Sequence, residues 1–334
     1  MKALVYEGEC NLALREVPRP LPGAGEVLIR VGAVGICGSD MHAYLGHDAR
    51  RPAPLILGHE AAGTVEAGAD VPGAPSAGTA VTINPLVTCG TCPACVAGRE
   101  NICPDRQIIS MPPREGAFAQ YLAMPPANLV PVPEGIPLAR AALAEPLAVG
   151  WHAARIGLAV LSPHGDPVPD RALVIGGGAI GLASALALAA MGLRDITIHE
   201  PHPARRHFLA DRCAQRVSES QVAAPLVVDA VGLAATRAAA SASVLPGGVI
   251  VHVGLAEDLG GLDVRRMTLQ EVTFIGSYTY TAQDFRDTAQ ALFDGRLGPL
   301  EWFETRPLEK GAEAFADLRA GAVAAPKIVL DPWA

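Results

Sequence analysis

Residues 35–42 place a thiol, a hydroxyl, a carboxylate and an imidazole in one short stretch, and the thiol is that of Cys37. The pair His59 and Glu60 follows, and Glu145 lies much further along the chain. Thiolate, imidazole and carboxylate form a ligand set that suits zinc and leaves a position open for water or substrate. Each residue alone is more often a packed or hydrogen-bonded side chain, so their combination predicts a catalytic metal site.

A second group of thiols has the spacing of a metal loop. The chain has seven cysteines, an odd number that argues against a disulfide framework in a protein of this size. Four of them lie at Cys89, Cys92, Cys95 and Cys103. Four thiolates can close a tetrahedron around zinc and leave no open position, which predicts a structural metal. An iron–sulfur cluster is the alternative, since it also uses four cysteines.

A glycine-rich motif marks a change of pattern in the second half of the chain. An apolar run at 172–175 precedes Gly-Gly-Gly-Ala-Ile-Gly at 176–181, which opens an apolar helical segment. A second apolar run at 195–199 ends at the acidic residue Glu200. Strand, glycine turn, helix, strand and acid together are the context of a dinucleotide fingerprint.

The fingerprint assigns roles to single residues. Gly176 permits the tight turn, Gly178 lets the backbone approach a pyrophosphate, and Gly181 lets helix and strand pack closely. The pyrophosphate is expected at the helix N-terminus. Glu200 would bind the adenosine ribose hydroxyls and repel a 2′-phosphate, which predicts NAD over NADP; the alternative is that Glu200 only caps the next helix.

The coarse pattern predicts an α/β protein with two parts. Up to about residue 145, short apolar runs such as 27–34, 61–65 and 80–83 are broken by glycine and proline, which indicates a β-rich, barrel-like domain. Later runs at 226–229 and 249–253 alternate with helical segments, which predicts a doubly wound parallel sheet.

Composition excludes several classes of function. At 334 residues and a formal net charge of −8, the chain has room for two domains and no basic surface for nucleic acid. The uncharged run 172–193 is split by its three glycines, so no membrane span is predicted. An acid at Glu7 interrupts any signal-peptide core, so a cytoplasmic protein is expected.

Taken together, these motifs resemble the zinc-containing medium-chain dehydrogenase/reductase family, in its sorbitol (polyol) dehydrogenase-like branch. The resemblance covers nearly the whole chain and rests on G-I-C-G-S-D-M-H, G-H-E, the four-cysteine loop, A-L-A-E-P-L, G-G-G-A-I-G, V-D-A-V-G and G-S-Y-T-Y. It implies a GroES-like catalytic zinc domain at 1–147 and 278–334, and an NAD-binding Rossmann domain at 148–277.

The resemblance also implies residue roles. Cys37 and His59 bind a catalytic zinc, with Glu60 or Glu145 as the third ligand, and Cys89, Cys92, Cys95 and Cys103 bind a structural one. Ser39 and His42 form a proton relay. The cofactor-binding residues implied by the fingerprint and the resemblance are Gly176, Gly178, Ala179, Ile180, Gly181, Glu200, Arg205, Val231, Val253 and Ser277.

The implied activity is hydride transfer between a secondary alcohol, a polyol or sugar alcohol, and NAD, in a homodimer or homotetramer. The alternatives are a related dehydrogenase for simple secondary alcohols, threonine or a phosphorylated polyol, and a non-catalytic zinc- and NAD-binding relative. Ala43 departs from the aromatic residue common after the relay histidine in this branch, which leaves Tyr44 and Phe118 as candidates to line the substrate pocket.

One segment of the second part is unusually short. Residues 203–214 can form a helix and 215–218 an edge strand, which leaves only 219–225 before the next apolar strand. Parallel crossovers usually need a dozen or more residues and a helix. The crossover helix is therefore predicted to be missing or reduced to a turn, which would leave one flank of the sheet thinly covered, with exposed apolar surface that a neighbouring subunit could cover.

Overall fold

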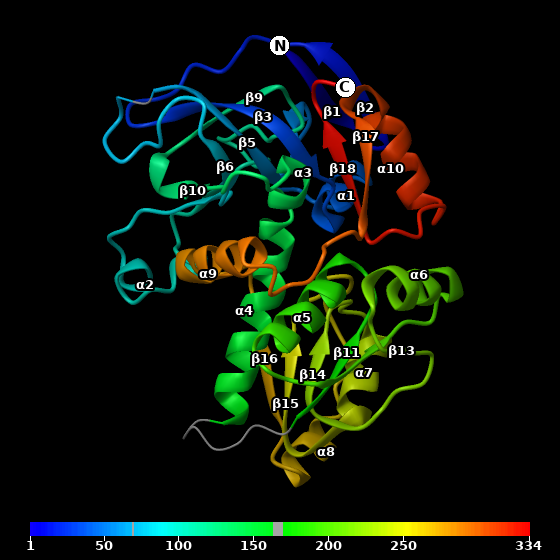
Figure 1. Cartoon of the computed structure of the whole chain (residues 1–334). Coiled ribbons are helices and arrows are strands. Elements are labelled where there is room, and N and C mark those ends of the chain that lie inside the picture. Colours follow the sequence, from blue (N-terminus) through cyan, green and yellow to red (C-terminus); the bar gives the residue numbers. More distant parts are fainter. Residues whose placement is uncertain (69, 163–169) are drawn as a thin grey trace. The chain divides into compact units, whose positions relative to one another are not determined.

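The computed structural model describes residues 1–68, 70–162 and 170–334, which fold as two compact units (Figure 1). The first unit comprises Met1–Glu145, Thr281–Asp294 and Phe303–Ala334. The second comprises Pro146–Tyr280 and Gly295–Trp302. Within the described ranges, none of the helices has both the length and the apolar character needed to cross a membrane.

The first unit is built on a seven-stranded sheet with the strand order β10-β6-β5-β3-β18-β17, in which β9 also pairs with β3. Its strands are β3 (Val27–Gly35), β5 (Glu60–Ala67), β6 (Ala80–Ile83), β9 (Tyr121–Met124), β10 (Leu129–Pro131), β17 (Phe303–Pro307) and β18 (Lys327–Asp331). The three apolar runs expected as strands in this part lie in β3, β5 and β6, so the β-rich prediction is confirmed.

Smaller elements complete this unit. The short strands form two further sheets, β2 (Asn11–Glu16), β1 (Lys2–Gly8) and β4 (Leu55–Ile56) in one, and β7 (Leu86–Val87) and β8 (Gln107–Ile108) in the other. The helices are α1 (Gly38–Tyr44), α2 (Pro93–Val96), α3 (Leu138–Ala141), α9 (Ala282–Phe293) and α10 (Gly311–Arg319). Short 3-10 turns lie at Glu100–Ile102, Pro126–Asn128 and Leu308–Lys310.

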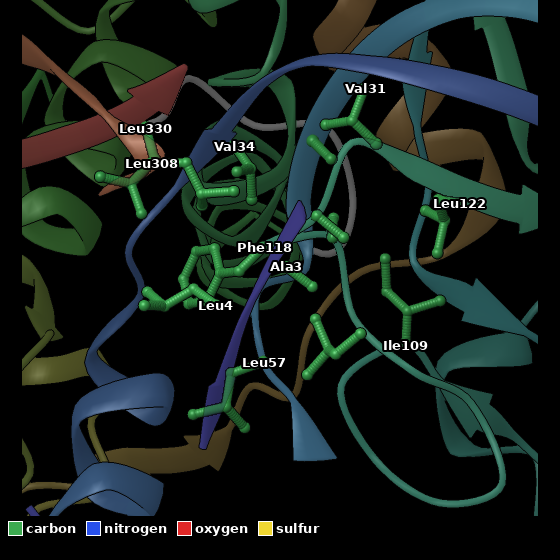
Figure 2. Packing of buried hydrophobic residues seen from close by; sticks show 14 of the residues in the cluster. Ala3, Leu4, Val31, Val34, Leu57, Ile109, Phe118, Leu122, Leu308 and Leu330 are labelled. Atoms are coloured by element: carbon green, nitrogen blue, oxygen red, sulfur yellow. The ribbon is translucent and has the colours of Figure 1, made fainter. Parts of the chain in front are cut away.

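The core of the first unit joins both ends of the chain. Figure 2 shows Leu4, Phe118, Leu308 and Leu330 in one cluster of buried apolar side chains. Phe315 of α10 adds edge contacts, since its ring centroid lies 5.9 Å from that of Phe118 and 5.2 Å from that of Tyr44. Phe118 is fully buried, so it offers no surface to a substrate, contrary to the expectation from sequence.

The second unit is a six-stranded sheet in which every pair is parallel. The strand order is β13 (Val217–Ser218), β12 (Asp195–His199), β11 (Arg171–Ile175), β14 (Ala224–Asp229), β15 (Val244–His252) and β16 (Thr273–Gly276). The helices are α4 (Ala144–Leu161), α5 (Ala179–Ala190), α6 (Pro203–Cys213), α7 (Ala234–Ser243) and α8 (Val264–Leu269).

Helices cover both faces of this sheet. Gly157 of α4 packs against Leu226 and Val251, which point to one face. Val227 and Ile250 point to the other face and pack with residues of α7. The prediction of a doubly wound parallel sheet is therefore confirmed.

The predicted loss of the crossover helix is also confirmed. Residues 219–223 link β13 to β14 without a helix. Strand β12 alternates Ile196 and Ile198 on the α5 side with Thr197 and His199 on the opposite side, where that helix would pack. Because those two side chains are polar, this flank is not the apolar surface expected to await a neighbouring subunit.

Replacing Phe315 by Ala is expected to lower the free energy of unfolding of the first unit by about 3–5 kcal/mol, the usual cost of removing a buried aromatic side chain. The measurement is a urea titration followed by circular dichroism. Leu21→Ala, at a side chain that is 91% exposed, is the control and should change the free energy by less than about 0.5 kcal/mol. Equal losses in the two variants would contradict the described packing.

Candidate metal and cofactor sites

Antiparallel pairing of β3 and β5 assembles the first candidate site. Gly35, at the end of β3, lies opposite Glu60, at the start of β5. Cys37 follows β3 as the N-cap of α1, and His59 directly precedes β5. One ligand atom each from Cys37, His59 and Glu60 lie within 4.8 Å of one another, a separation that one metal ion can bridge.

Two glycines make room for these ligands. A methyl group added at Gly35 would lie 2.1 Å from Oε2 of Glu60, so the carboxylate occupies the space above that α-carbon. Gly58, directly before His59, has a φ of +90° and would place a methyl group 2.5 Å from the Phe118 ring. Glycine is required at both positions, by space at the first and by backbone conformation as well at the second.

Glu60 divides its two oxygens between two environments. Oε1 forms an ion pair of 2.6 Å with Nζ of Lys327, and both side chains are buried. Nζ also donates to the carbonyl of Ile36 at 2.9 Å. Oε2 is buried and accepts no hydrogen bond from the described residues. A buried carboxylate oxygen without a partner is costly, and a cation at this point would satisfy it, so the residues fit a metal ion.

The ion pair keeps Lys327 charged in spite of its burial. Burial lowers the pKa of Lys327, but the charges of Glu60, Cys37 and Glu145 outweigh burial and raise it above its usual value. The same anions favour any other cation that enters the site.

His59 is held by Asp40 from the side of its Nδ1 atom. Nδ1 lies 3.4 Å from Oδ1 of Asp40, whose oxygens also accept from the backbone N–H of Cys37 at 3.0 Å and of Gly58 at 3.2 Å. Burial alone would raise the pKa of Asp40, but the charge of His59 and these hydrogen bonds bring it below its usual range. Nε2 therefore remains as the nitrogen that can bind a metal.

The remaining residues expected around this site lie as follows. Ser39, in α1, has its Oγ 3.5 Å from Nε2 of His59. His42 lies on the same helix with an exposed side chain. Glu145 is buried at the start of α4 and is not one of the three grouped ligands, although its charge reaches Lys327.

The four cysteines of the loop form a second group. Their sulfur atoms all lie within 4.8 Å of one another, and Sγ of Cys89 is 3.5 Å from that of Cys103 and 3.9 Å from that of Cys95. Two backbone N–H groups each donate to the sulfur three residues earlier, that of Cys92 to Cys89 at 3.4 Å and that of Cys95 to Cys92 at 3.5 Å. Such N–H groups stabilise thiolates, and burial together with neighbouring thiols raises the pKa of Cys95. The donor set is that of a closed tetrahedral metal site.

The glycine motif of the second unit has the geometry of a dinucleotide turn. Gly176 has a φ of +98°, and a methyl group at Gly181 would lie 1.8 Å from the carbonyl oxygen of Gly176, so helix and strand meet with no room for a side chain. A methyl group at Gly178 would meet nothing within 4 Å, which leaves open space at the N-terminus of α5, where Ala179 and Ile180 begin the helix.

Glu200 lies beside this turn. It is 4% exposed, and its oxygens accept from the N–H of Gly177 at 2.9 Å and of His202 at 2.8 Å. Nη1 of Arg205 is 3.7 Å from Oε2 of Glu200, while Nε of Arg205 is buried without a partner in the described chain. The carboxylate is thus fixed at the carboxyl end of β12, where a ribose of a dinucleotide is expected.

The last three expected cofactor residues also follow carboxyl ends of strands. Val231 follows β14, Val253 follows β15 and Ser277 follows β16. The N–H of Val253 donates to Asp229 and that of Ser277 to His252, each across to the neighbouring strand. Oγ of Ser277 is buried without a hydrogen-bond partner among the described residues, so a donor or acceptor of a ligand could satisfy it.

Sequence reasoning missed four residues at the first site, Lys327, Asp40, Arg51 and Ser110. Lys327 carried a weak signal, as a charged residue at the edge of the apolar run Ile328–Leu330. Asp40 lies in the chemical stretch but received no role there. Arg51 is buried, and its Nε donates to the carbonyl of Ser110 at 3.0 Å. No local sequence pattern marked Arg51 or Ser110.

Comparison with known proteins identifies the family. Residues 23–134 match the alcohol dehydrogenase GroES-like domain family. The chain is 31% identical over 312 residues to the L-galactonate-5-dehydrogenase of Escherichia coli K12, covering 89% of this chain and 88% of the relative. It is 33% identical over 299 residues to the sorbitol dehydrogenase of Bacillus subtilis 168, covering 84% and 82%. The chain belongs to the zinc-containing medium-chain dehydrogenase/reductase family, in its polyol dehydrogenase-like branch.

A solved structure agrees over the full length. The acetophenone reductase of Geotrichum candidum NBRC 4597, determined in complex with NAD, superposes with a TM-score of 0.87 at 27% identity and covers 99% of this chain and 97% of that one. The predicted family, the GroES-like and Rossmann fold classes and the class of enzyme, an NAD- and zinc-using alcohol or polyol dehydrogenase, are confirmed.

Two variants that each add one methyl group should affect the Cys37 metal site and the dinucleotide site separately. Gly181→Ala places a methyl group 1.8 Å from a backbone oxygen of the glycine turn. NADH affinity, measured by fluorescence titration, is expected to fall at least about tenfold, equal to about 1.4 kcal/mol. Gly35→Ala displaces the Glu60 carboxylate and should lower the metal content, with NADH affinity unchanged.

Each variant serves as the control for the other, since both add one methyl group in a different unit. Elemental analysis of Gly181→Ala should give the metal content of the unmodified protein. Loss of NADH affinity and of metal content in both variants would mean that the methyl groups act by unfolding the chain. That result would contradict separate effects on the two sites.

Proposed function

We propose that the chain oxidises a secondary hydroxyl of a polyol or sugar alcohol with NAD, at a catalytic zinc held by Cys37, His59 and Glu60. The observation that carries the proposal is the grouping of one ligand atom from each of these residues within 4.8 Å of one another. In addition, Oε2 of Glu60 is buried and has no hydrogen-bond partner in the described chain. The relative named sorbitol dehydrogenase supports the substrate class. In this proposal 1–147 and 278–334 form the zinc domain and 148–277 the NAD domain.

The bound zinc supplies Lewis acidity toward an alcohol oxygen, and NAD supplies the hydride acceptor. Asp40 holds the ring of His59, and Lys327 holds one oxygen of Glu60, so both ligands are oriented before anything binds. Ser39, half-buried beside His59, passes the alcohol proton toward His42, which is exposed on the same helix and can release it to water. Glu145 acts as a further carboxylate near the metal.

The four-cysteine loop holds the second, structural zinc in this proposal. Four thiolates satisfy zinc completely, so this ion fixes the loop 89–103 and takes no part in hydride transfer. The resident metal, zinc or an iron–sulfur cluster, is read directly from iron, sulfide and zinc analysis of the purified protein.

In this proposal the cofactor binds at the carboxyl ends of the parallel strands. The turn Gly176, Gly178 and Gly181 receives the pyrophosphate, Glu200 and Arg205 the adenosine ribose, and Val231, Val253 and Ser277 the nicotinamide half.

A homodimer or homotetramer completes the proposal. The second unit exposes large apolar side chains at Leu255, Leu259, Val264 and Leu269, which supports contact with another subunit. None of the seven cysteines forms a disulfide, which supports a reducing, cytoplasmic location.

Sugar acids are a second candidate class of substrate. Two relatives that cover most of this chain are named for such substrates, L-galactonate-5-dehydrogenase at 31% identity and 2-dehydro-3-deoxy-L-galactonate 5-dehydrogenase at 30%. A substrate panel with matched polyols and aldonates decides between the classes by the ratio of their kcat/KM values.

The deciding experiment measures NAD reduction across that panel together with zinc content. The unmodified protein should hold two zinc ions per chain, as the two ligand groups require. Cys37→Ser and His59→Ala should abolish turnover, retain NADH binding and lose one of the two ions, and Glu145→Ala should lower kcat.

Cys103→Ser supplies the matched control, because it removes a thiolate ligand from the other group. It should lose the structural zinc and stability. If the unmodified protein oxidised no member of the panel while holding two zinc ions, the catalytic proposal would fail.

Cofactor preference tests the place of Glu200. Its buried carboxylate would face a 2′-phosphate at close range, so kcat/KM should be higher with NAD than with NADP. Glu200→Ala should narrow the preference by at least about tenfold, equal to about 1.4 kcal/mol. Equal kcat/KM for the two cofactors in the unmodified protein would refute this assignment.

A further inference from the structure

Ser110 has a backbone conformation that serine rarely adopts. Its φ is +70°, in the left-handed region, and its side chain is fully buried in the first unit. Such a conformation strains a non-glycine residue and persists only where the surroundings hold it. Glycine would adopt it without strain, and the contacts of the serine hydroxyl are the feature that glycine would lack.

The surroundings hold the backbone of Ser110 through Arg51. Nε of Arg51 donates to the carbonyl of Ser110 at 3.0 Å. Arg51 is 3% exposed and is itself held by an ion pair with Asp48. The hydrogen bond reaches the main chain, so it fixes the position of residue 110 and leaves the hydroxyl of Ser110 free for another partner.

That partner is the imidazole of His59. Oγ of Ser110 lies 3.3 Å from Nδ1 of His59, and Oδ1 of Asp40 lies 3.4 Å from the same nitrogen. Both oxygens of Asp40 already accept backbone N–H groups, from Cys37 and Gly58. Two acceptors of similar distance therefore flank one N–H, and the hydroxyl is the one without a charge.

We propose that Ser110 is a positioning residue of the metal site, which shares the Nδ1–H of His59 with Asp40 and so presents Nε2 to the metal. Two acceptors on one N–H fix the tautomer and the plane of the ring more firmly than the single contact with Asp40 does. The strained backbone is the means by which the hydroxyl reaches the ring. This inference rests on the proposed function of Cys37, His59 and Glu60.

Two substitutions separate the hydroxyl from the backbone. Ser110→Ala removes the hydroxyl and keeps the strain, while Ser110→Gly removes the hydroxyl and relieves the strain. The Ser110→Gly variant should therefore have a higher melting temperature than the Ser110→Ala variant. If the hydroxyl positions His59, both variants should lose affinity for the catalytic metal, and kcat, by about 10–100-fold, the range typical for partners of metal-binding histidines.

The metal readout is a cobalt(II) titration after selective removal of the catalytic zinc, with the visible absorption bands reporting ligand geometry. Both variants should show weaker binding and altered bands relative to the unmodified protein. Ser241→Ala is the matched control, since it removes a buried hydroxyl that bonds the carbonyl of Arg237 in the second unit. It should lower stability and leave the cobalt bands and affinity unchanged.

The outcomes are distinguishable. A glycine variant with the metal affinity, bands and kcat of the unmodified protein would overturn the proposal, as would variants whose metal affinity simply followed their melting temperatures. An unmodified protein that binds no metal through Cys37 would overturn the proposed function first, and the role of Ser110 with it. An alanine variant that fails to fold leaves the decision to the glycine variant.

Discussion

The buried ion pair between Lys327 and Glu60 is the contact on which the proposed metal site depends. A charge buried in this way is tolerable only while its partner is present, and losing either one leaves the other uncompensated. Lys327 begins β18, which pairs with β3, and its ammonium also bonds the carbonyl of Ile36, directly before Cys37. The last strand of the chain therefore orients Glu60 and the backbone beside Cys37, two of the three proposed metal ligands, and this arrangement requires the C-terminal segment to join the first unit.

Close backbone packing is the second constraint on both sites. The absence of a side chain at Gly35 leaves room for the Glu60 carboxylate of the proposed metal site. The absence of a side chain at Gly181 leaves room for the carbonyl of Gly176, beside the start of α5 where the phosphate is proposed to bind. In both places the structure uses the missing side chain to bring a polar group within reach of a ligand. Ser110 is a different case, since its φ is positive and it carries a side chain, as five other non-glycine residues among the described ones do.

The sequence predicted what depends on local pattern. The grouping of the candidate ligands Cys37, His59 and Glu60, the glycine turn and the helix-free link after β13 each follow from residue types at short spacing. Long-range pairing lay beyond that pattern, since Lys327 and Glu60 are separated by 267 positions. Phe118 was expected near the substrate and instead lies in the core, because a ring contact with Phe315 could not be anticipated from either local sequence. Residues 295–302 belong to the second unit for the same reason, although they lie between two segments of the first.

The ion pair also sets the charge of the ligand group. Cys37 and Glu60 would together bring two negative charges to a divalent metal, and an ammonium 2.6 Å from Glu60 offsets one of them. Because the pair is buried, solvent screens this compensation only weakly. A metal bound in the proposed site would keep more of its positive charge than a thiolate and an unpaired carboxylate would allow, and positive charge would stabilise an alcohol oxygen as it loses its proton. A glutamate paired with Lys327, as the proposed third ligand, would thus bind the metal and leave it Lewis-acidic toward the alcohol oxygen.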